Sequence, residues 1–422
     1  MFRRTTAVLL IIVMFVLPLS GCKKDGSQTT GNADTTLTPT QTVNEPAGTD
    51  NGSDTDKSAE DAETGDTAGS NTEEAPAEGG FRTASEIVAS MSVGWNLGNT
   101  FDSFGAGNTL SSETYWSNPK TTHEMIDAVA AQGFNTIRIP VTWAEHLGSA
   151  PDYAIDEKWI NRVKEVVDYA MDNNMYVMIN THHETEFWLK MDQDEKALCD
   201  ELAAIWKQVA EFFKDYPDNL IFEGMNEPRT KGSPQEWNGG TYDERKKINS
   251  MNAAFIDAVR STGGNNANRS LVICTYGHSA ATPAISALEV PEDDENIIIA
   301  VHAYTPYFFT YDAAGGYSEW TGDQVSDIKS FVTVLAQHYT MAGIPVVITE
   351  FGAVNKKNTS DVIAWITDYM GILNKYGIKC IWWDNGQYTS NGENFGIFNR
   401  RKLEWFNKDI ADALVNNSVV NK

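Results

Sequence analysis

Residues 220–228 read Leu-Ile-Phe-Glu-Gly-Met-Asn-Glu-Pro, a short apolar run that ends in polar residues. The run has the length and composition of a buried β-strand. Amphipathic helical patterns separate it from similar runs elsewhere in the chain. Seven further runs of this kind lie at 93–97, 136–141, 176–181, 271–276, 297–304, 345–349 and 379–383.

Continuously apolar strands that alternate with helices indicate a parallel sheet covered on both faces. Eight strand and helix units in one chain predict the α/β fold called the (β/α)8 or TIM barrel. A doubly wound open sheet shows the same alternation, and the number of strands alone does not exclude it. The polar residues that follow the runs favour the barrel, because a barrel builds its active site from its strand ends.

The first 21 residues are typical of an export signal. Arg3 and Arg4 precede an apolar run over residues 7–17, which is too short to be a spanning helix. The Leu-Ser-Gly that precedes Cys22 resembles the bacterial lipobox, in which the cysteine is lipidated and becomes the mature N-terminus. We therefore expect an extracellular lipoprotein anchored to the bacterial cell surface. An ordinary signal peptide that ends near a cysteine is the alternative.

The composition of the segment after the signal predicts a disordered linker at residues 22–80. From residue 23 to residue 80 it holds 13 acidic residues, three lysines and no aromatic residue. Residues 81–422 then form a single catalytic domain. The formal net charge of the whole chain is −26, which argues against nucleic acid and anionic membrane surfaces as partners. We expect membrane contact only through the N-terminal lipid, and we expect a monomer.

Three cysteines follow Cys22 in the sequence: Cys199, Cys274 and Cys380. One disulfide among them is possible. Cys274 and Cys380 lie in apolar runs, however, and buried free thiols are the favoured interpretation. No Cys-x-x-Cys spacing is present, and no metal or other cofactor is predicted.

Two glutamates, Glu227 and Glu350, follow the fourth and seventh runs, whose ends face each other across a barrel mouth. Glycoside hydrolysis needs one protonated carboxyl to assist the leaving oxygen and one ionised carboxyl to attack the anomeric carbon. We assign Glu227, beside Asn226, as the acid/base and Glu350 as the nucleophile. Arg138 and Tyr304 are candidate donors that would keep Glu350 ionised. A salt bridge at the barrel mouth is the structural alternative for either glutamate alone.

Taken together, the strand ends resemble the successive signatures of glycoside hydrolase family 5, the cellulase family. The resemblance spans about residues 81 to 415 and points to the branch of clostridial and ruminal endoglucanases. It is carried by Gly-Trp-Asn-Leu-Gly-Asn-Thr at 94–100, Ile-Arg-Ile-Pro at 137–140, Asn-Thr-His-His-Glu at 180–184, Gly-Met-Asn-Glu-Pro at 224–228, Val-His-Ala-Tyr at 301–304, Ile-Thr-Glu-Phe-Gly at 348–352 and Trp-Trp-Asp-Asn-Gly at 382–386.

The resemblance implies an endo-1,4-β-glucanase that hydrolyses internal β-1,4-glucosidic bonds by a retaining double displacement. By position it implies the acid/base at Glu227, the nucleophile at Glu350 and an aromatic platform at Trp383. The substrate, a β-glucan such as cellulose, mixed-linkage glucan or xyloglucan, stays open, and so do lichenase and mannanase activities. The expected substrate contacts are Asn96, Arg138, His182, His183, Asn226, His302, Tyr304 and Trp383.

Further aromatic residues lie in the predicted strand-end loops and are candidates for glucose subsites. Sugar rings stack on aromatic side chains, so a set of them around one mouth favours a long open groove. Any single one of them is more often a packing residue. The candidates are Trp143, Trp188, Trp237, Tyr307, Phe308 and Trp320.

Two other classes of protein remain as alternatives. A metal-dependent barrel hydrolase could use the histidines of the strand ends together with Glu350. That interpretation lacks a His-x-His pair after the first strand and leaves Asn226 and Glu227 without a role. An inactive carbohydrate-binding surface protein is the second alternative, and the presence of both Glu227 and Glu350 speaks against it.

Overall fold

The structure, a computed structural model, describes residues 80–184, 194–389 and 392–420. The predicted signal peptide, Cys22, the predicted linker up to residue 79 and the subsite candidate Trp188 lie outside the described residues. Within the described ranges, no helix has both the length and the apolar character needed to cross a membrane.

Eight parallel strands close into a barrel in the order of the sequence, which confirms the predicted (β/α)8 fold. The open-sheet alternative is wrong, because the first strand pairs with the last, Gly94 with Ile381 and Trp95 with Trp382. The strands are β1 (Gly94–Asn96), β2 (Thr136–Ile139), β3 (Tyr176–Asn180), β4 (Leu220–Glu223), β5 (Leu271–Ser279), β6 (Ile297–His302), β7 (Val346–Phe351) and β8 (Lys379–Trp382).

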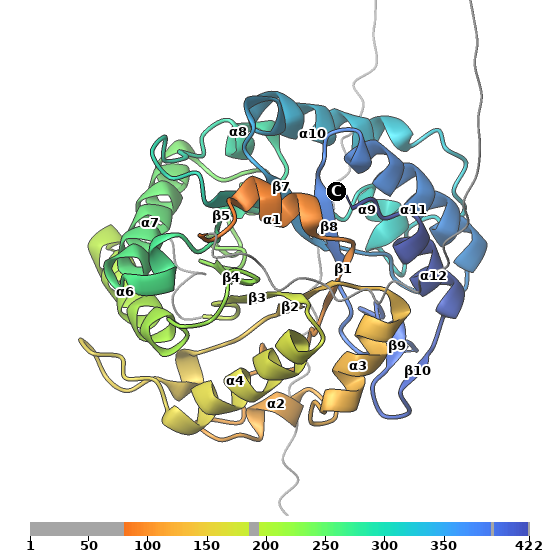
Figure 1. Cartoon of the computed structure of the whole chain (residues 1–422). Coiled ribbons are helices and arrows are strands. Elements are labelled where there is room, and N and C mark those ends of the chain that lie inside the picture. Colours follow the sequence, from red (N-terminus) through yellow and green to blue (C-terminus); the bar gives the residue numbers. More distant parts are fainter. Residues whose placement is uncertain (1–79, 185–193, 390–391, 421–422) are drawn as a thin grey trace, which may run out of the picture. The chain divides into compact units, whose positions relative to one another are not determined.

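Helices surround the barrel as an outer ring (Figure 1). In α4 (Glu157–Asp172) the apolar residues recur at helical spacing, and Asp156 caps the helix by accepting from two backbone N–H groups. A two-stranded sheet of β9 (Phe398–Asn399) and β10 (Glu404–Trp405) follows β8. The helices are α2 (Ser112–Tyr115), α3 (His123–Gln132), α4 (Glu157–Asp172), α6 (Glu195–Phe212), α7 (Tyr242–Ser261), α8 (Thr282–Ile285), α9 (Tyr307–Thr310), α10 (Val325–His338), α11 (Thr359–Asn374) and α12 (Lys408–Asn416).

A short helix, α1 (Ala84–Ser90), lies across one end of the barrel and was not predicted from the sequence (Figure 1). Thr83 and Glu86 form a capping box that starts it. Ile87 and Val88 are buried in one cluster with apolar side chains of β3 to β8. Because α1 directly precedes β1, it covers the N-terminal ends of the strands, and the site is left to the opposite end.

The regular pairing of the strands is interrupted where the strands approach the barrel mouth. The register shifts between Val301 and His302 on β6, so that His302 pairs with Glu350 of β7. A second shift lies between Ile348 and Phe351 where β7 meets β8. Such irregularities change the direction in which a side chain points.

The cysteines of the described residues are all free thiols. Cys274 and Cys380 are buried, as predicted, and Cys199 is half-buried.

Candidate active site

The guanidinium of Arg138 is the centre of the polar network inside the barrel mouth. It is fully buried, and its three nitrogens donate to side chains from three other strands or strand ends. Nε donates to Glu223 at 2.6 Å, and Nη1 donates to Glu350 at 2.8 Å and to Asn96 at 3.0 Å. Nη2 donates to Asn226 at 2.9 Å. One planar cation therefore fixes the positions of two carboxylates and two amides.

Asn96 and Arg138 were predicted to contact the substrate, and both side chains are fully buried in this structure, where they contact other residues of the site. The amide of Asn96 donates to the carbonyl oxygen of Thr349 at 3.0 Å and lies within hydrogen-bond distance of those of Ile381 and Trp382. Asn96 thus ties β1 to β7 and β8 and holds Arg138 in place. Arg138 in turn contacts Glu350, the other role that the sequence suggested for it.

Glu350 lies at the end of β7 with almost no exposure to solvent. Arg138 contacts its Oε1, and the hydroxyl of Tyr304 donates to its Oε2 at 3.0 Å. Burial and the negative charge of an ionised Glu227 raise the pKa of Glu350 to about 8, although Arg138 and Tyr304 act to lower it. The protonation of Glu350 therefore depends on that of Glu227.

Glu227 follows β4 with a backbone φ of 45°, in the left-handed region. Its Oε1 lies 2.8 Å from Nδ1 of His302, and its Oε2 accepts from Arg229 at 3.1 Å. Burial raises the pKa of Glu227, but the contacts with His302 and Arg229 outweigh it and hold this pKa well below its usual range. The imidazole of His302 is neutral near pH 7, because burial lowers its pKa to about 3.

The two glutamates lie close together across the mouth. One oxygen of Glu227, one oxygen of Glu350 and a ring nitrogen of His302 are all within 4.8 Å of one another. Retaining glycosidases hold their carboxyl groups about 5 to 5.5 Å apart, and inverting ones about 6.5 to 9.5 Å apart. Burial and the charge of the nearby Glu227 raise the pKa of Glu350 to about 8, so the pair carries one proton at neutral pH.

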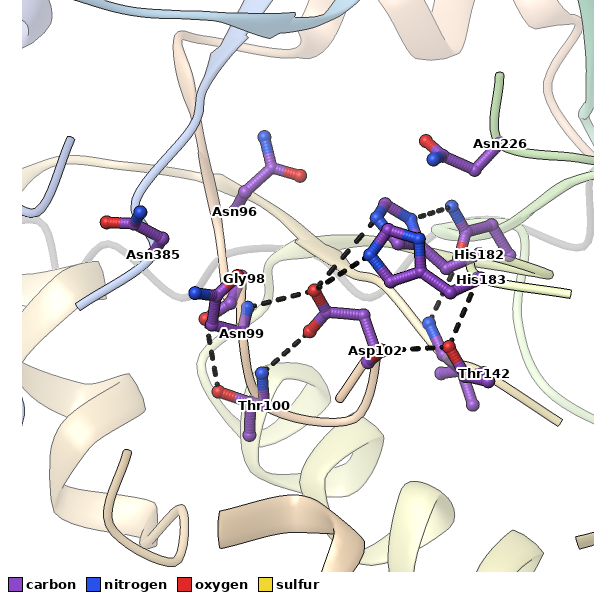
Figure 2. A network of polar contacts seen from close by, with 12 residues as sticks. Asn96, Gly98, Asn99, Thr100, Asp102, Thr142, His182, His183, Asn226 and Asn385 are labelled. Carbon is purple, nitrogen blue, oxygen red and sulfur yellow. Dashed lines mark hydrogen bonds and ion pairs between the residues drawn. The ribbon is translucent and has the colours of Figure 1, made fainter. Parts of the chain in front are cut away.

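His182 and His183 follow β3 and face a buried carboxylate, Asp102 (Figure 2). Oδ2 of Asp102 lies 4.0 Å from Nε2 of each histidine. Asp102 also accepts from the backbone N–H groups of Asn99 at 3.0 Å and Thr100 at 2.6 Å. Burial raises the pKa of Asp102 to about 6. Asp102 was not predicted as a site residue, since it lies in a loop six residues beyond its strand.

Three groups among the described residues have the spacing of metal ligands, which bears on the metal-hydrolase alternative. One of them, Glu227 with His302 and Glu350, is the carboxyl pair itself. The others depend on the ring nitrogens of His182 and His278. The groups are Asp102, His182 and His183; Glu223, His278 and His302; and Glu227, His302 and Glu350.

Hydrogen bonding decides the tautomer of His182. Asn180 accepts the N–H of Val141 through Oδ1 at 3.0 Å, so its amide nitrogen is the group that faces Nδ1 of His182 at 3.2 Å. Nδ1 therefore accepts, and burial holds the pKa of His182 well below its usual value. The ring proton is on Nε2, the nitrogen that faces Asp102.

His278 follows the same pattern, because its Nδ1 accepts the backbone N–H of Glu227 at 2.9 Å. Its proton is then on Nε2, which lies 3.4 Å from Oε1 of Glu223. In both groups a nitrogen that would have to offer a lone pair to a metal is a donor instead. These two groups do not fit a divalent metal.

Trp383 lies directly after β8, and its ring is parallel to that of His182, with the centroids 5.8 Å apart and the planes at 6°. It packs in a small cluster with Val354 and Phe395, against which Tyr304 is also packed. The structure thus brings Trp383, His182 and Tyr304 to the same mouth as the two glutamates.

The other aromatic candidates divide into two kinds. Trp143 has no exposed surface and packs in the core, and Trp320 is almost fully buried. The indole N–H of Trp143 donates to the carbonyl of Asn180, and that of Trp320 donates to Asp368 on α11. By contrast, Trp237 is exposed in the loop after β4, and Tyr307 and Phe308 are exposed on the short helix α9 after β6.

Sequence reasoning missed Glu223 and His278, which are both fully buried next to the predicted site. Burial raises the pKa of Glu223, but Arg138 and His278 outweigh it and lower the pKa to about 2. Glu223 was visible as a single charged residue inside the apolar run at 220–225. A charge in such a run requires a buried partner, which in this chain is Arg138.

The family profile of cellulases, glycosyl hydrolase family 5, matches residues 98–389. The chain belongs to this family. Endoglucanase A of Ruminococcus albus is 50% identical over 341 residues, which cover 80% of this chain and 93% of that protein. The protein is a glycoside hydrolase, as the sequence predicted.

Solved structures of the family are similar to this barrel. A xyloglucan-specific endo-β-1,4-glucanase from a metagenomic library, in complex with cellotriose, is 57% identical with a TM-score of 0.77. The similarity covers 79% of this chain and 98% of that chain. A broad-specificity endoglucanase from Clostridium acetobutylicum is 42% identical with a TM-score of 0.76, over 79% of this chain and 100% of that one.

Proposed function

We propose that the protein is an endo-β-1,4-glucanase that cleaves internal bonds of a β-glucan chain with retention of configuration. The observation that carries this proposal is the close pair of Glu227 and Glu350 on opposite sides of the barrel mouth. The endoglucanase names of the relatives support the substrate class. The xyloglucan-specific relative keeps xyloglucan within the expected range of substrates.

In the proposed mechanism Glu350 attacks the anomeric carbon while Glu227 protonates the departing glycosidic oxygen. Glu227 then removes a proton from the water that releases the sugar from Glu350. Glu227 suits this exchange because its side chain is about 20% exposed, whereas that of Glu350 is about 7% exposed. The more accessible carboxyl is the one that must meet the leaving group and the water.

The single proton of the pair must be on Glu227 when the first step begins. Burial and the charge of an ionised Glu227 are what raise the pKa of Glu350. Protonation of Glu227 removes that charge, and Arg138 and Tyr304 then stabilise the ionised nucleophile. A glycosidic oxygen placed against Glu227 gives the protonated form an acceptor, so a bound substrate favours this arrangement.

Assays on polysaccharides test the proposed activity. We expect release of reducing ends from carboxymethylcellulose, lichenan or xyloglucan, with a rapid fall in the viscosity of the polymer because internal bonds are cut. Mannan is included in the panel as the competing substrate of the family. Activity on mannan alone, or release of reducing ends without loss of viscosity, would contradict the proposal.

Substitution of either glutamate tests the two roles. Glu350→Gln should lower kcat by about 10⁴-fold or more, because no nucleophile remains. Glu227→Gln should lower it by about 10² to 10⁴-fold, the usual contribution of general acid and base catalysis. Glu211→Gln, on the exposed surface of α6, is the matched control and should retain full activity. Near-native activity of Glu350→Gln, with its fold verified by circular dichroism, would exclude it as the nucleophile.

The pH dependence of kcat/KM should be bell-shaped, because only the singly protonated pair is active. The rate falls when the pH drops through the lower pKa of the pair, since the nucleophile is then protonated. It falls again as the pH rises through about 8, where the last shared proton is lost. In Glu227→Gln, assayed on 2,4-dinitrophenyl β-cellobioside, the alkaline limb should disappear. A limb that remained near pH 8 in this variant would have another origin.

We also propose that Cys22 carries a lipid that anchors the protein outside the bacterial cell, and that the catalytic domain acts as a monomer. The lipobox-like Leu-Ser-Gly before Cys22 supports the anchor. Wild-type protein expressed in a bacterial host should incorporate labelled palmitate and sediment with membranes, and Cys22→Ser should do neither. Equal sedimentation of both forms would count against the anchor.

A further inference from the structure

His278 lies near the end of β5, between the acid/base and the buried ion pair. Its Nδ1 accepts the backbone N–H of Glu227 at 2.9 Å. Its ring stacks on that of His302, with centroids 4.1 Å apart and planes at 27°. Its Nε2 faces Oε1 of Glu223 at 3.4 Å. One buried imidazole thus touches the main chain of Glu227, the side-chain partner of Glu227 and the carboxylate that pairs with Arg138.

The contact with the backbone N–H matters because of the conformation of Glu227. Its φ of 45° lies in the left-handed region, which is unfavourable for a residue with a side chain. Such a conformation persists only where the surroundings hold it in place. Nδ1 of His278 holds the N–H of Glu227 in this conformation, and the conformation directs the carboxyl of Glu227 towards His302.

The orientation of His278 is fixed from its other side. Because Nδ1 accepts, Nε2 carries the ring proton. Among the described residues, neither this Nε2 nor Oε1 of Glu223 has a hydrogen-bond partner of good geometry, and each is the polar atom that the other faces. The ionised Glu223 accepts a hydrogen bond from Nε of Arg138 at 2.6 Å, which fixes its position. The imidazole of His278 therefore faces a carboxylate that is itself held in place.

We propose that His278 is a positioning residue that orients the acid/base carboxyl of Glu227. It does so through the backbone of Glu227 and the ring of His302, and it connects both to the Glu223–Arg138 pair on which Glu350 also depends. This inference rests on the proposed role of Glu227. The alternative is a packing residue of the barrel interior, whose loss would lower stability and impair both glutamates alike.

The dependence of kcat/KM on the leaving group separates these two roles, because kcat/KM reports the first chemical step. Phenyl β-cellobioside needs a proton from Glu227, and 2,4-dinitrophenyl β-cellobioside has a leaving group that departs without one. His278→Phe keeps a ring against His302 but has neither ring nitrogen. We expect a fall of about 10 to 100-fold in kcat/KM on the phenyl substrate and less than about threefold on the dinitrophenyl substrate.

Two further variants complete the measurement. His278→Gln can offer an acceptor to the N–H of Glu227 and a donor to Glu223, and it should recover a leaving-group dependence close to that of the wild type. If His278→Phe does not fold, His278→Leu, which also lacks both ring nitrogens, takes its place with the same expected result. His146→Phe is the control for loss of a buried histidine, since His146 stacks on Trp159 and contacts Asn108. It should change thermal stability without changing the ratio of the two substrates.

An equal fall on both substrates, or no fall on either, would overturn the proposal for His278. Glu227→Ala in the same assay distinguishes this failure from failure of the proposed function. If Glu227→Ala shows the selective loss on the phenyl substrate and His278→Phe does not, only the positioning role is wrong. If Glu227→Ala lowers both substrates equally, the assignment of Glu227 as acid/base fails as well.

Discussion

The site depends on the burial of one cation between two carboxylates. The guanidinium of Arg138 has no contact with solvent and pairs with both Glu223 and Glu350. A buried charge is tolerated only when it is paired and its hydrogen-bonding groups are satisfied, and the planar fork of arginine meets both conditions here. Glu223 is ionised and already balances the charge of Arg138, since its pKa is lowered to about 2. Arg138 therefore orients Glu350 firmly but only partly neutralises it. Because Arg138 neutralises Glu350 only in part, the pKa of Glu350 still depends on whether Glu227 is ionised.

The barrel supplies the geometry that this ion pair requires. Arg138 is on β2, Glu223 on β4 and Glu350 on β7, so one side chain reaches across the interior to strands on both sides. The register shift on β6 places His302 beside Glu350, where it can also contact Glu227. At the other end of the barrel α1 buries apolar side chains against the strands. The apolar end and the polar end are thus separated within one interior.

The eight apolar runs were enough to predict eight strands, because period and length indicate a strand without knowledge of its neighbours, and the polar residues after the runs favoured a barrel over an open sheet. The positions of Glu227 and Glu350 after the fourth and seventh runs were enough to predict that they share a mouth. The depth of each side chain was not predictable, since it depends on strand register and tilt. For that reason the sequence did not reveal that the side chains of Asn96 and Arg138 have no exposed surface. Trp143 was expected in a subsite for the same reason and lies in the core. The helix α1 has seven residues, too few for a periodic pattern to be recognised.

Two histidines of the site, His182 and His278, share one hydrogen-bonding arrangement, which bears on whether the site can hold a metal ion. In His182 and in His278, Nδ1 accepts a hydrogen bond from an amide N–H, and Nε2 therefore carries the proton. Each Nε2 faces a buried carboxylate, Asp102 in one case and Glu223 in the other. Both donors are thus directed at carboxylates, whereas a metal ion needs a lone pair that is absent at these nitrogens. Burial also holds the pKa values of His182 and His302 well below the usual value, so these two rings do not take up the single proton of the glutamate pair. The same hydrogen bonds that fix the tautomers thus disfavour a metal ion at these two histidines and leave acid and base chemistry to Glu227 and Glu350.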